Sequence, residues 1–326
     1  MLDKNFPLYI LAFVVSFMLT VFIEKAIIPA LSKSAQQPIY AEGPKWHVKK
    51  SGTPTMGGLA FMIAISLSLI VCSFFLIDNR ETVLSLLLCQ LYAISNSCVG
   101  ILDDLKKLKK KQNKGLSGKG KLSLQLILSI AFLIAREMLL NDGQNASFSF
   151  GELNLGYAYY PIAVFILLGI INCANLTDGI DGLASSVAFS VGVSLLYISA
   201  ALNSEVALIS SSIIGATVGF LIFNLHPAKI FMGDTGSLYF GALIAATSLS
   251  LHNPFLIIFI SGVYVFEGCT VILQVIWFKL FKKRIFKMAP FHHHLEECGW
   301  SENKICIVAI ISTFIFSIPA YIFYLP

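Results

Sequence analysis

Long apolar segments alternate with short polar ones along the whole chain. Runs of about 17 to 25 apolar residues are long enough to cross a bilayer as helices. These runs lack the strict alternation of barrel strands, so we expect helices and not sheets to span the membrane. We predict ten transmembrane helices, at 7–29, 57–77, 82–101, 121–140, 157–174, 183–202, 206–225, 237–251, 254–278 and 305–324. The first run is long for a signal peptide, which favours a retained helix.

Composition supports this pattern. Of the 326 residues, 56% are hydrophobic and only 13% are charged, and the mean hydropathy is +0.79. These values exclude an ordinary soluble domain. Because the apolar runs recur from end to end, we predict one all-α integral membrane domain over residues 1–326. The seven cysteines include no C-x-x-C pair, so we expect free thiols and not a disulfide or zinc framework.

Basic residues gather in three of the loops between the predicted helices. They are Lys33, Lys45, Lys49 and Lys50 in the first loop, Lys106, Lys107, Lys109, Lys110, Lys111, Lys114, Lys119 and Lys121 in the third, and Lys279, Lys282, Lys283, Arg284, Lys287 and Lys304 in the ninth. The loops at 78–81, 141–156 and 203–205 carry almost none. The positive-inside rule therefore predicts that odd-numbered loops are cytoplasmic and that both termini lie outside. The net charge of +5 indicates topology and not nucleic-acid binding.

Five polar segments fall in the loops predicted to be cytoplasmic. They are residues 52–58, 102–104, 172–182, 226–237 and 288–296. A carboxylate beside the hydrocarbon region is costly unless something compensates it. Several carboxylates on one side therefore predict a site that binds metal and phosphate at the membrane edge.

Asp103 and Asp104 are expected to close the third helix, where acidic side chains oppose the helix macrodipole. Adjacent helical residues point about 100° apart, so the two would share one ligand only if the helix ends there. The alternative is a solvated helix end. A nearby cation explains the costly arrangement better.

The fifth loop offers Asn175, Asp178 and Asp181. If a helix begins near Thr177, the two acids face one way. Gly179 would let a phosphate or a ring approach the backbone closely. The alternative is a turn followed by an N-capped helix.

Asp234 precedes the eighth helix in a turn flanked by glycines. Such a helix start is expected to present free amide groups and a positive dipole end to phosphate. Oxygen ligands beside phosphates favour magnesium over zinc. The alternative is that Asp234 only caps the helix.

His292, His293 and His294 are consecutive, so on a helix they splay apart and cannot easily hold one ion. We expect them to act as phosphate donors or proton carriers. The basic, apolar segment before them predicts either a surface helix or a helix end with snorkelling lysines. Glu267 lies within the ninth span, as a functional acid or as a structural partner. Glu24, Arg136 and Glu137 are expected to be interfacial.

Taken together, these segments resemble the phospho-N-acetylmuramoyl-pentapeptide transferases, a family within the polyprenyl-phosphate sugar-1-phosphate transferases. The resemblance covers nearly the whole chain and runs through residues 52–58, 103–104, 175–182, 226–237 and 288–296, with 299–301 after them. The segment Ala289-Pro290-Phe291-His292-His293-His294 resembles the muramoyl-pentapeptide branch in particular.

The resemblance implies transfer of phospho-N-acetylmuramoyl-pentapeptide from UDP-N-acetylmuramoyl-pentapeptide to undecaprenyl phosphate, with Mg2+, giving lipid I and UMP. This is the first membrane step of peptidoglycan biosynthesis. The expected location is the bacterial plasma membrane, with the active site facing the cytoplasm. The resemblance also implies a homodimer.

For the catalytic roles we assign Mg2+ to Asp234 and the lipid phosphate to Asp103, supported by Asp104, with His293 as a further catalytic residue. The expected substrate-binding residues are Asn175, Asp178, Gly179, Asp181, Phe231, Asn224, Lys107, Lys111, Lys119, Gln274, Thr53, His292 and His294. A lipid phosphate is already a competent nucleophile, which favours direct transfer over an aspartyl-phosphate intermediate.

Two other functions fit parts of the sequence. A sister enzyme would transfer a different sugar-1-phosphate to the same carrier, and the histidine segment argues against it. A transporter would carry acids near the middle of its spans, whereas only Glu267 lies there.

Overall fold

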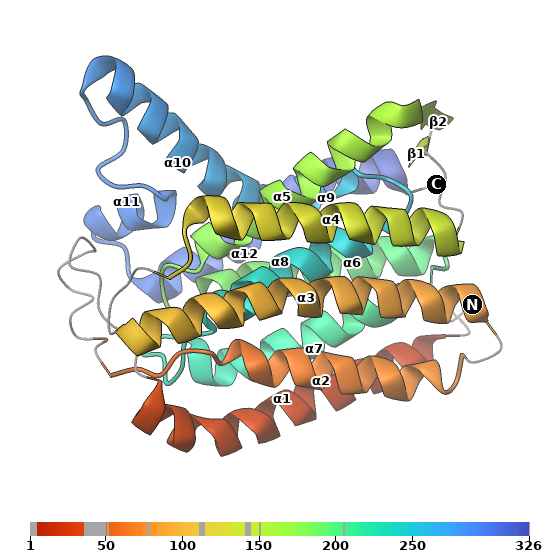
Figure 1. Cartoon of the computed structure of the whole chain (residues 1–326), viewed down its shortest axis with the longest axis horizontal. Helices are drawn as coiled ribbons and strands as arrows, with labels where there is room; N and C mark the ends of the chain where they lie inside the picture. The colour runs from red at the N-terminus through yellow and green to blue at the C-terminus, as the bar shows by residue number, and fades with distance from the viewer. Residues whose placement is uncertain are drawn as a thin grey trace.

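The computed structural model is a bundle of helices (Figure 1), and it describes residues 5–35, 50, 52–76, 79–110, 115–140, 145–149, 151–204 and 206–325. The helices are α1 (Phe6–Ser34), α2 (Gly58–Ser73), α3 (Arg80–Lys110), α4 (Gly118–Leu140), α5 (Tyr159–Thr177), α6 (Leu183–Ala201), α7 (Ala207–Asn224), α8 (Gly233–Leu249), α9 (Leu256–Ile260), α10 (Gly262–Phe281), α11 (Phe291–Glu297) and α12 (Glu302–Tyr324), with a short 3-10 turn at Gly156–Ala158. Within the described ranges, 8 helices are long and apolar enough to cross a membrane. The chain is therefore a multi-pass membrane protein.

The ninth predicted helix is divided in the structure. The range 254–278 contains α9 and α10, which are separated at Ser261. The side chain of Phe316 on α12 lies so close to Gly262 that a Cβ there would be 2.5 Å from it. The prediction of one continuous helix was wrong, because hydropathy does not register a break between two equally apolar segments.

A small hairpin occupies part of the stretch expected to be a plain loop. Strands β1 (Asn145–Phe148) and β2 (Gly151–Asn154) pair antiparallel. The backbone N–H of Ser149 donates to the carbonyl of Phe323 at 2.7 Å, and the ring of Phe148 stacks on Tyr324. The hairpin therefore packs against the end of α12.

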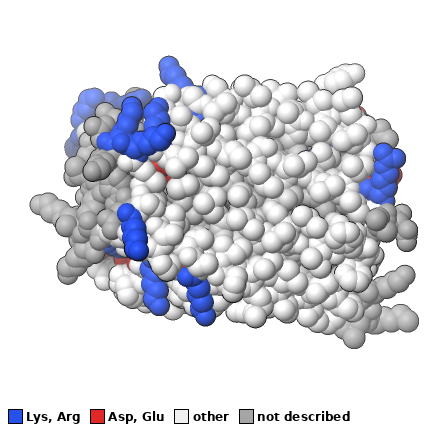
Figure 2. Space-filling view, turned by 60° about the horizontal axis from the view of Figure 1, so that its bottom comes forward, with Lys and Arg blue, Asp and Glu red and all other residues white. Residues whose placement is uncertain are grey.

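The most deeply buried helix is α8, in which every residue from Thr235 to Leu249 is buried. Elsewhere in the bundle, serines let helices approach closely and satisfy each other's polar groups. Ser68 on α2 contacts Ser212 on α7 at 3.1 Å, and Ser16 on α1 donates to the Ser212 carbonyl. The face in Figure 2 carries a broad band without charged residues, and Lys and Arg gather mainly at one end of it. This is the pattern expected of a lipid-facing surface.

Two charged residues expected at the membrane interface are buried inside the bundle. Arg136 is 3% exposed and donates to the Ser250 hydroxyl at 2.6 Å. Glu24 is fully buried, and within the described part of the chain neither of its carboxylate oxygens has a hydrogen-bond partner. Both side chains therefore turn into the bundle, and their predicted interfacial depth stays a prediction. Glu137 is half-buried near the end of α4.

Candidate active site

Three aspartates from two helices come together at one end of the bundle. Asp103 and Asp104 lie on α3 and Asp234 lies in the first turn of α8, and each offers a carboxylate oxygen within 4.8 Å of the others. The prediction that Asp103 and Asp104 close the third helix was wrong, since α3 continues to Lys110. The next turn supplies Lys107, which compensates the acids and lets the helix continue.

Two ammonium groups lie among these carboxylates. Lys107 Nζ is 2.7 Å from Asp103 Oδ2 and 3.1 Å from Asp234 Oδ1. Lys121, from the first turns of α4, pairs with Asp234 and lies 3.6 Å from Asp103. The backbone N–H of Leu116 also donates to Asp103 at 2.6 Å, which folds the start of α4 onto the site. Nothing in the sequence distinguished Lys121 from the other lysines of its loop.

Asp104 has a structural task that sequence spacing could not reveal. Its carboxylate accepts the backbone N–H groups of Asp234 at 3.2 Å and Thr235 at 2.9 Å, and the Thr235 hydroxyl at 2.8 Å. It therefore caps α8 from another helix. The expectation that α8 presents these amides to phosphate was wrong, and so was the alternative that Asp234 caps the helix. Gly233 has φ +68°, and a Cβ there would lie 2.6 Å from Asp104 Oδ2.

Asp234 is held in place by an amide. Asn175 Nδ2 donates to Asp234 Oδ1 at 3.2 Å and to the Ser237 hydroxyl at 2.8 Å. Burial acts to raise the pKa of Asp234, but Lys107 and Lys121 outweigh it and hold that pKa below its usual range. Asp234 is therefore ionised, as a metal ligand must be. The donor set of Asp103, Asp104 and Asp234 is entirely oxygen, which fits Mg2+.

The helix start considered near Thr177 in the sequence is not present in the loop between α5 and α6. Thr177 ends α5, Asp178 follows it, and α6 starts only at Leu183. Asp178 and Asp181 consequently face different surroundings. Burial, together with the charges of Asp234 and Asp104, raises the pKa of Asp178 to about 8.

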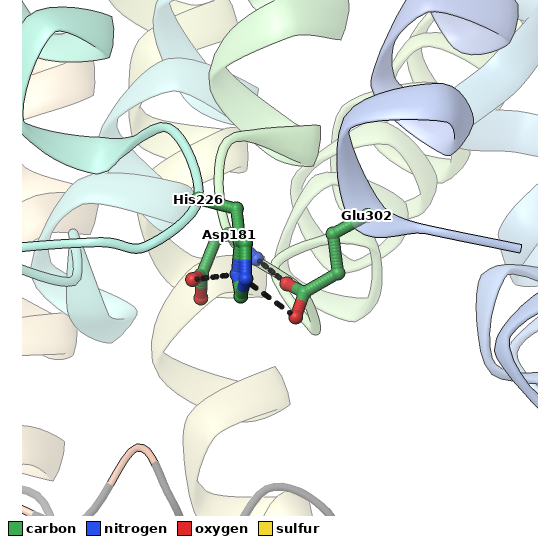
Figure 3. A group of neighbouring side chains, drawn as sticks. All are labelled: Asp181, His226 and Glu302. Atoms are coloured by element: carbon green, nitrogen blue, oxygen red, sulfur yellow. Dashed lines mark hydrogen bonds and ion pairs between the residues drawn. The ribbon is translucent and has the colours of Figure 1, made fainter.

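Asp181 belongs to a second cluster, with His226 and Glu302 (Figure 3). His226 Nδ1 lies 2.9 Å from Asp181 Oδ2 and 3.3 Å from Glu302 Oε1. Lys50 Nζ contacts Asp181 at 2.7 Å and Glu302 at 2.6 Å. The three side chains lie close enough to share a metal ion, but the Lys50 ammonium already supplies the positive charge. Glu302 was missed in the sequence, and Lys50 was interpreted only as a topology signal.

The amide of Asn224 and the backbone of Phe231 organise the loop that carries His226. Asn224 Oδ1 accepts from Gly182 N at 3.2 Å and from the Ser185 hydroxyl, and its Nδ2 donates to the Ile230 carbonyl at 2.9 Å. Phe231 N donates to the carbonyl of Pro54, next to Thr53, at 2.8 Å. This contact joins the first polar segment to the fourth.

The three histidines lie on α11 and point to three different partners. His292 is fully buried beside Glu267, His293 Nδ1 lies 2.6 Å from Glu296, and His294 Nδ1 accepts from the Lys287 backbone at 3.2 Å. Their separation agrees with the argument that consecutive helical residues splay apart.

Gln274, Lys119 and Lys111 complete the set of predicted site residues. Gln274 Oε1 accepts the backbone N–H groups of Ile285 and Phe286, so it holds the segment after α10. Lys119 is exposed at the start of α4. Lys111 lies outside the described residues, as do the loop lysines Lys45, Lys49 and Lys114.

Family models and individual relatives identify the same family of transferases. Residues 83–252 match the model described as glycosyl transferase family 4, and residues 50–62 match phospho-N-acetylmuramoyl-pentapeptide-transferase signature 1. A phospho-N-acetylmuramoyl-pentapeptide-transferase of Clostridium perfringens is 42% identical over 97% of this chain and 96% of its own length. Proteins of the same name from Halalkalibacterium halodurans and Caldicellulosiruptor bescii are 42% and 40% identical, over 91% and 95% of this chain and 92% and 96% of their own lengths.

Proposed function

The chain belongs to the phospho-N-acetylmuramoyl-pentapeptide-transferase family, and we propose that it carries out the transfer that this name describes. It moves phospho-N-acetylmuramoyl-pentapeptide from UDP-N-acetylmuramoyl-pentapeptide to undecaprenyl phosphate and releases UMP. The product is the lipid-linked muramoyl-pentapeptide, in the first membrane step of peptidoglycan biosynthesis. The observation that carries this proposal is the meeting of Asp103, Asp104 and Asp234 with Lys107 and Lys121 at one end of the bundle.

Asp103, Asp104 and Asp234 would hold Mg2+, with Asp234 as its principal ligand. Bound Mg2+ supplies charge neutralisation for the phosphate oxygens of the substrate. Asp234 suits this role because the amide of Asn175 fixes its direction and the nearby lysines keep it ionised. Lys107 and Lys121 would then turn toward the anionic substrate, where they stabilise the charge that develops on the leaving UMP.

Direct attack by the lipid phosphate fits the surroundings of Asp103. Its oxygens accept the Leu116 N–H and lie against two ammonium groups, so the carboxylate is held as an acceptor and not exposed as a nucleophile. Asp103 would orient the lipid phosphate or take its proton. Asp104, occupied in capping α8, supports the ion and the helix that carries Asp234.

The nucleoside and its phosphates would lie along the loop between α5 and α6. Asp178, Gly179 and Asp181 stand there, with Phe231, Asn224 and Thr53 on the neighbouring segments. His293 and His294, with His292, would meet the diphosphate or the sugar–peptide side. Lys107, Lys111, Lys119 and Gln274 are further candidates for the same surface. These roles follow from the family resemblance.

The site would face the cytoplasm of a bacterium, in its plasma membrane, with both chain termini outside and the protein forming a homodimer. The support for this orientation is that the lysine-rich loops and the five polar segments fall on the same side of the predicted topology. A soluble nucleotide can reach a lipid phosphate there.

One assay tests the proposed function. Purified protein is mixed with polyprenyl phosphate, Mg2+ and labelled UDP-N-acetylmuramoyl-pentapeptide, and UMP and labelled lipid are quantified. A parallel arm uses UDP-N-acetylglucosamine, which should give no lipid product. Absence of both UMP and labelled lipid in the first arm would overturn the proposal, and product only in the second arm would assign a sister enzyme instead.

A further inference from the structure

Glu267 lies inside α10, and its carboxylate binds the backbone at the start of α11. It is 4% exposed, and it accepts the backbone N–H of His292 at 3.1 and 3.3 Å through its two oxygens. Its Oε2 also lies 3.3 Å from His292 Nδ1. The buried carboxylate therefore lies on the side of the imidazole that carries Nδ1.

The other nitrogen of His292 faces the predicted nucleotide loop. His292 is fully buried, and within the described chain neither ring nitrogen has a hydrogen-bond partner: Nδ1 lies against Glu267 Oε2 without the geometry of a hydrogen bond, and Nε2 lies on the opposite side of the ring. A Cβ added to Gly179 would lie 2.2 Å from Nε2, so the ring is pressed against the backbone between Asp178 and Asp181. A buried polar atom without a partner is costly, so its retention beside this loop indicates a partner supplied by a ligand.

We propose that Glu267 is a positioning residue for the transfer reaction, and this inference rests on the proposed function. It holds His292 with Nδ1–H toward its own carboxylate and Nε2 toward the loop at Gly179. When the nucleotide substrate binds, the ring takes a proton from solvent and Nε2–H donates to a diphosphate oxygen. The negative charge of Glu267 balances the imidazolium formed in this way.

A purely structural role makes a different prediction. The residue before α11 is Pro290, whose side chain gives no cap, so Glu267 could serve only to satisfy the His292 backbone N–H. That backbone bond survives any change of the His292 side chain. Replacing Glu267 by Gln keeps an oxygen acceptor for it while removing the charge, so the two roles can be separated.

The test is a double-mutant cycle with Glu267→Gln, His292→Gln and the double variant. The dissociation constant for UDP-N-acetylmuramoyl-pentapeptide is measured with Mg2+ present, and kcat and KM are measured in the transfer assay. We expect Glu267→Gln to weaken substrate binding or lower kcat about tenfold, at unchanged melting temperature. In the His292→Gln background the same change should alter neither quantity by more than about twofold, since the group it acts through is gone.

Glu24→Gln is the matched control, because Glu24 is a fully buried carboxylate on α1, a helix that packs chiefly against α7 and α2. It should stay within about twofold of wild type. Wild-type affinity and kcat in Glu267→Gln, or an equal loss in both backgrounds of the cycle, would overturn the proposal. If the transfer rate of His292→Gln is too low to measure, the dissociation constants for the substrate still complete the double-mutant cycle. Wild-type protein that makes no UMP would instead count against the proposed function.

Discussion

Lys121 on α4 is paired with Asp234 on α8, inside the group of carboxylates that would bind the metal. Together with Lys107, it supplies two positive charges beside the three aspartates before any divalent ion arrives. A bound cation and the ammonium of Lys121 repel each other at this distance, so the two compete for Asp234. We therefore expect Lys121 to weaken metal binding while it supports catalysis.

Replacing Lys121 by Ala should raise the affinity for Mg2+ and still slow the transfer. Removing a positive charge a few ångströms from the ion favours binding by about tenfold or more. Loss of the ammonium that turns toward the substrate should lower kcat by about tenfold or more. Mg2+ binding is measured without substrate, by competition with a luminescent lanthanide, and kcat is measured at saturating Mg2+.

Lys119→Ala is the control for this metal titration. Lys119 is exposed on the same first turn of α4, so its loss should change the affinity for Mg2+ by no more than about twofold. An unchanged metal affinity in Lys121→Ala would show that Lys121 does not compete for the site.

Asp234→Asn should abolish most of the activity without unfolding the protein. The amide keeps the shape and can still accept from Asn175, but it loses the charge that holds a divalent ion. We expect kcat to fall by about 100-fold or more and the half-saturating Mg2+ concentration to rise. The melting temperature should change little, because Lys107 and Lys121 keep Asp103 as a partner. A near-normal rate with unchanged magnesium dependence would show that another residue binds the ion.

Hydropathy predicted the helices well, because residues that face lipid and residues that face the core are both apolar. It could not place the end of α3, since a lysine-rich stretch is compatible with a loop or with an exposed helix. Only the fold shows that Lys107 returns to Asp103 one turn away and stabilises that extension. Hydropathy also could not predict the break at Ser261, because the segments on both sides of it are apolar.

Motif spacing identified the acids of the site but not their partners. Asp104 caps α8 across 130 positions of sequence, which no local pattern records. Lys121 and Glu302 are ordinary charged residues at helix starts until the bundle brings them to Asp234 and Asp181. The chemistry of the cluster was therefore predictable, whereas its electrostatic balance depends on tertiary contacts.

Asp178 should make the stability of the protein depend on pH. Its pKa is raised to about 8 in the folded state, well above the ordinary value of an unfolded aspartate. Between these two values the folded protein keeps a proton that the unfolded chain releases, so stability falls as pH rises through about 8. Asp178→Asn cannot ionise and should lose this contribution.

The measurement is a melting temperature in detergent without metal, from pH 5 to pH 9. The difference between Asp178→Asn and wild type should grow in favour of the variant as pH rises. Parallel curves for the two proteins across this range would mean that Asp178 ionises in the folded state as readily as in the unfolded chain.

We predict that Lys50 prevents a metal ion from binding to the cluster of Asp181, His226 and Glu302. Its ammonium lies 2.7 Å from Asp181 and 2.6 Å from Glu302, the two carboxylates that His226 also contacts. In Lys50→Ala these groups lose their counter-charge, and we expect the free energy of unfolding to fall by on the order of 2 kcal/mol.

One imidazole and two carboxylates form a donor set that zinc accepts, and their atoms lie within 4.8 Å of one another. Added Zn2+ should therefore raise the melting temperature of Lys50→Ala but not that of wild type, since binding to the folded state stabilises it. The double variant Lys50→Ala, His226→Ala removes one ligand and should lose the zinc effect. Equal stabilisation of wild type and Lys50→Ala by Zn2+ would show that the ammonium does not occupy the cation position.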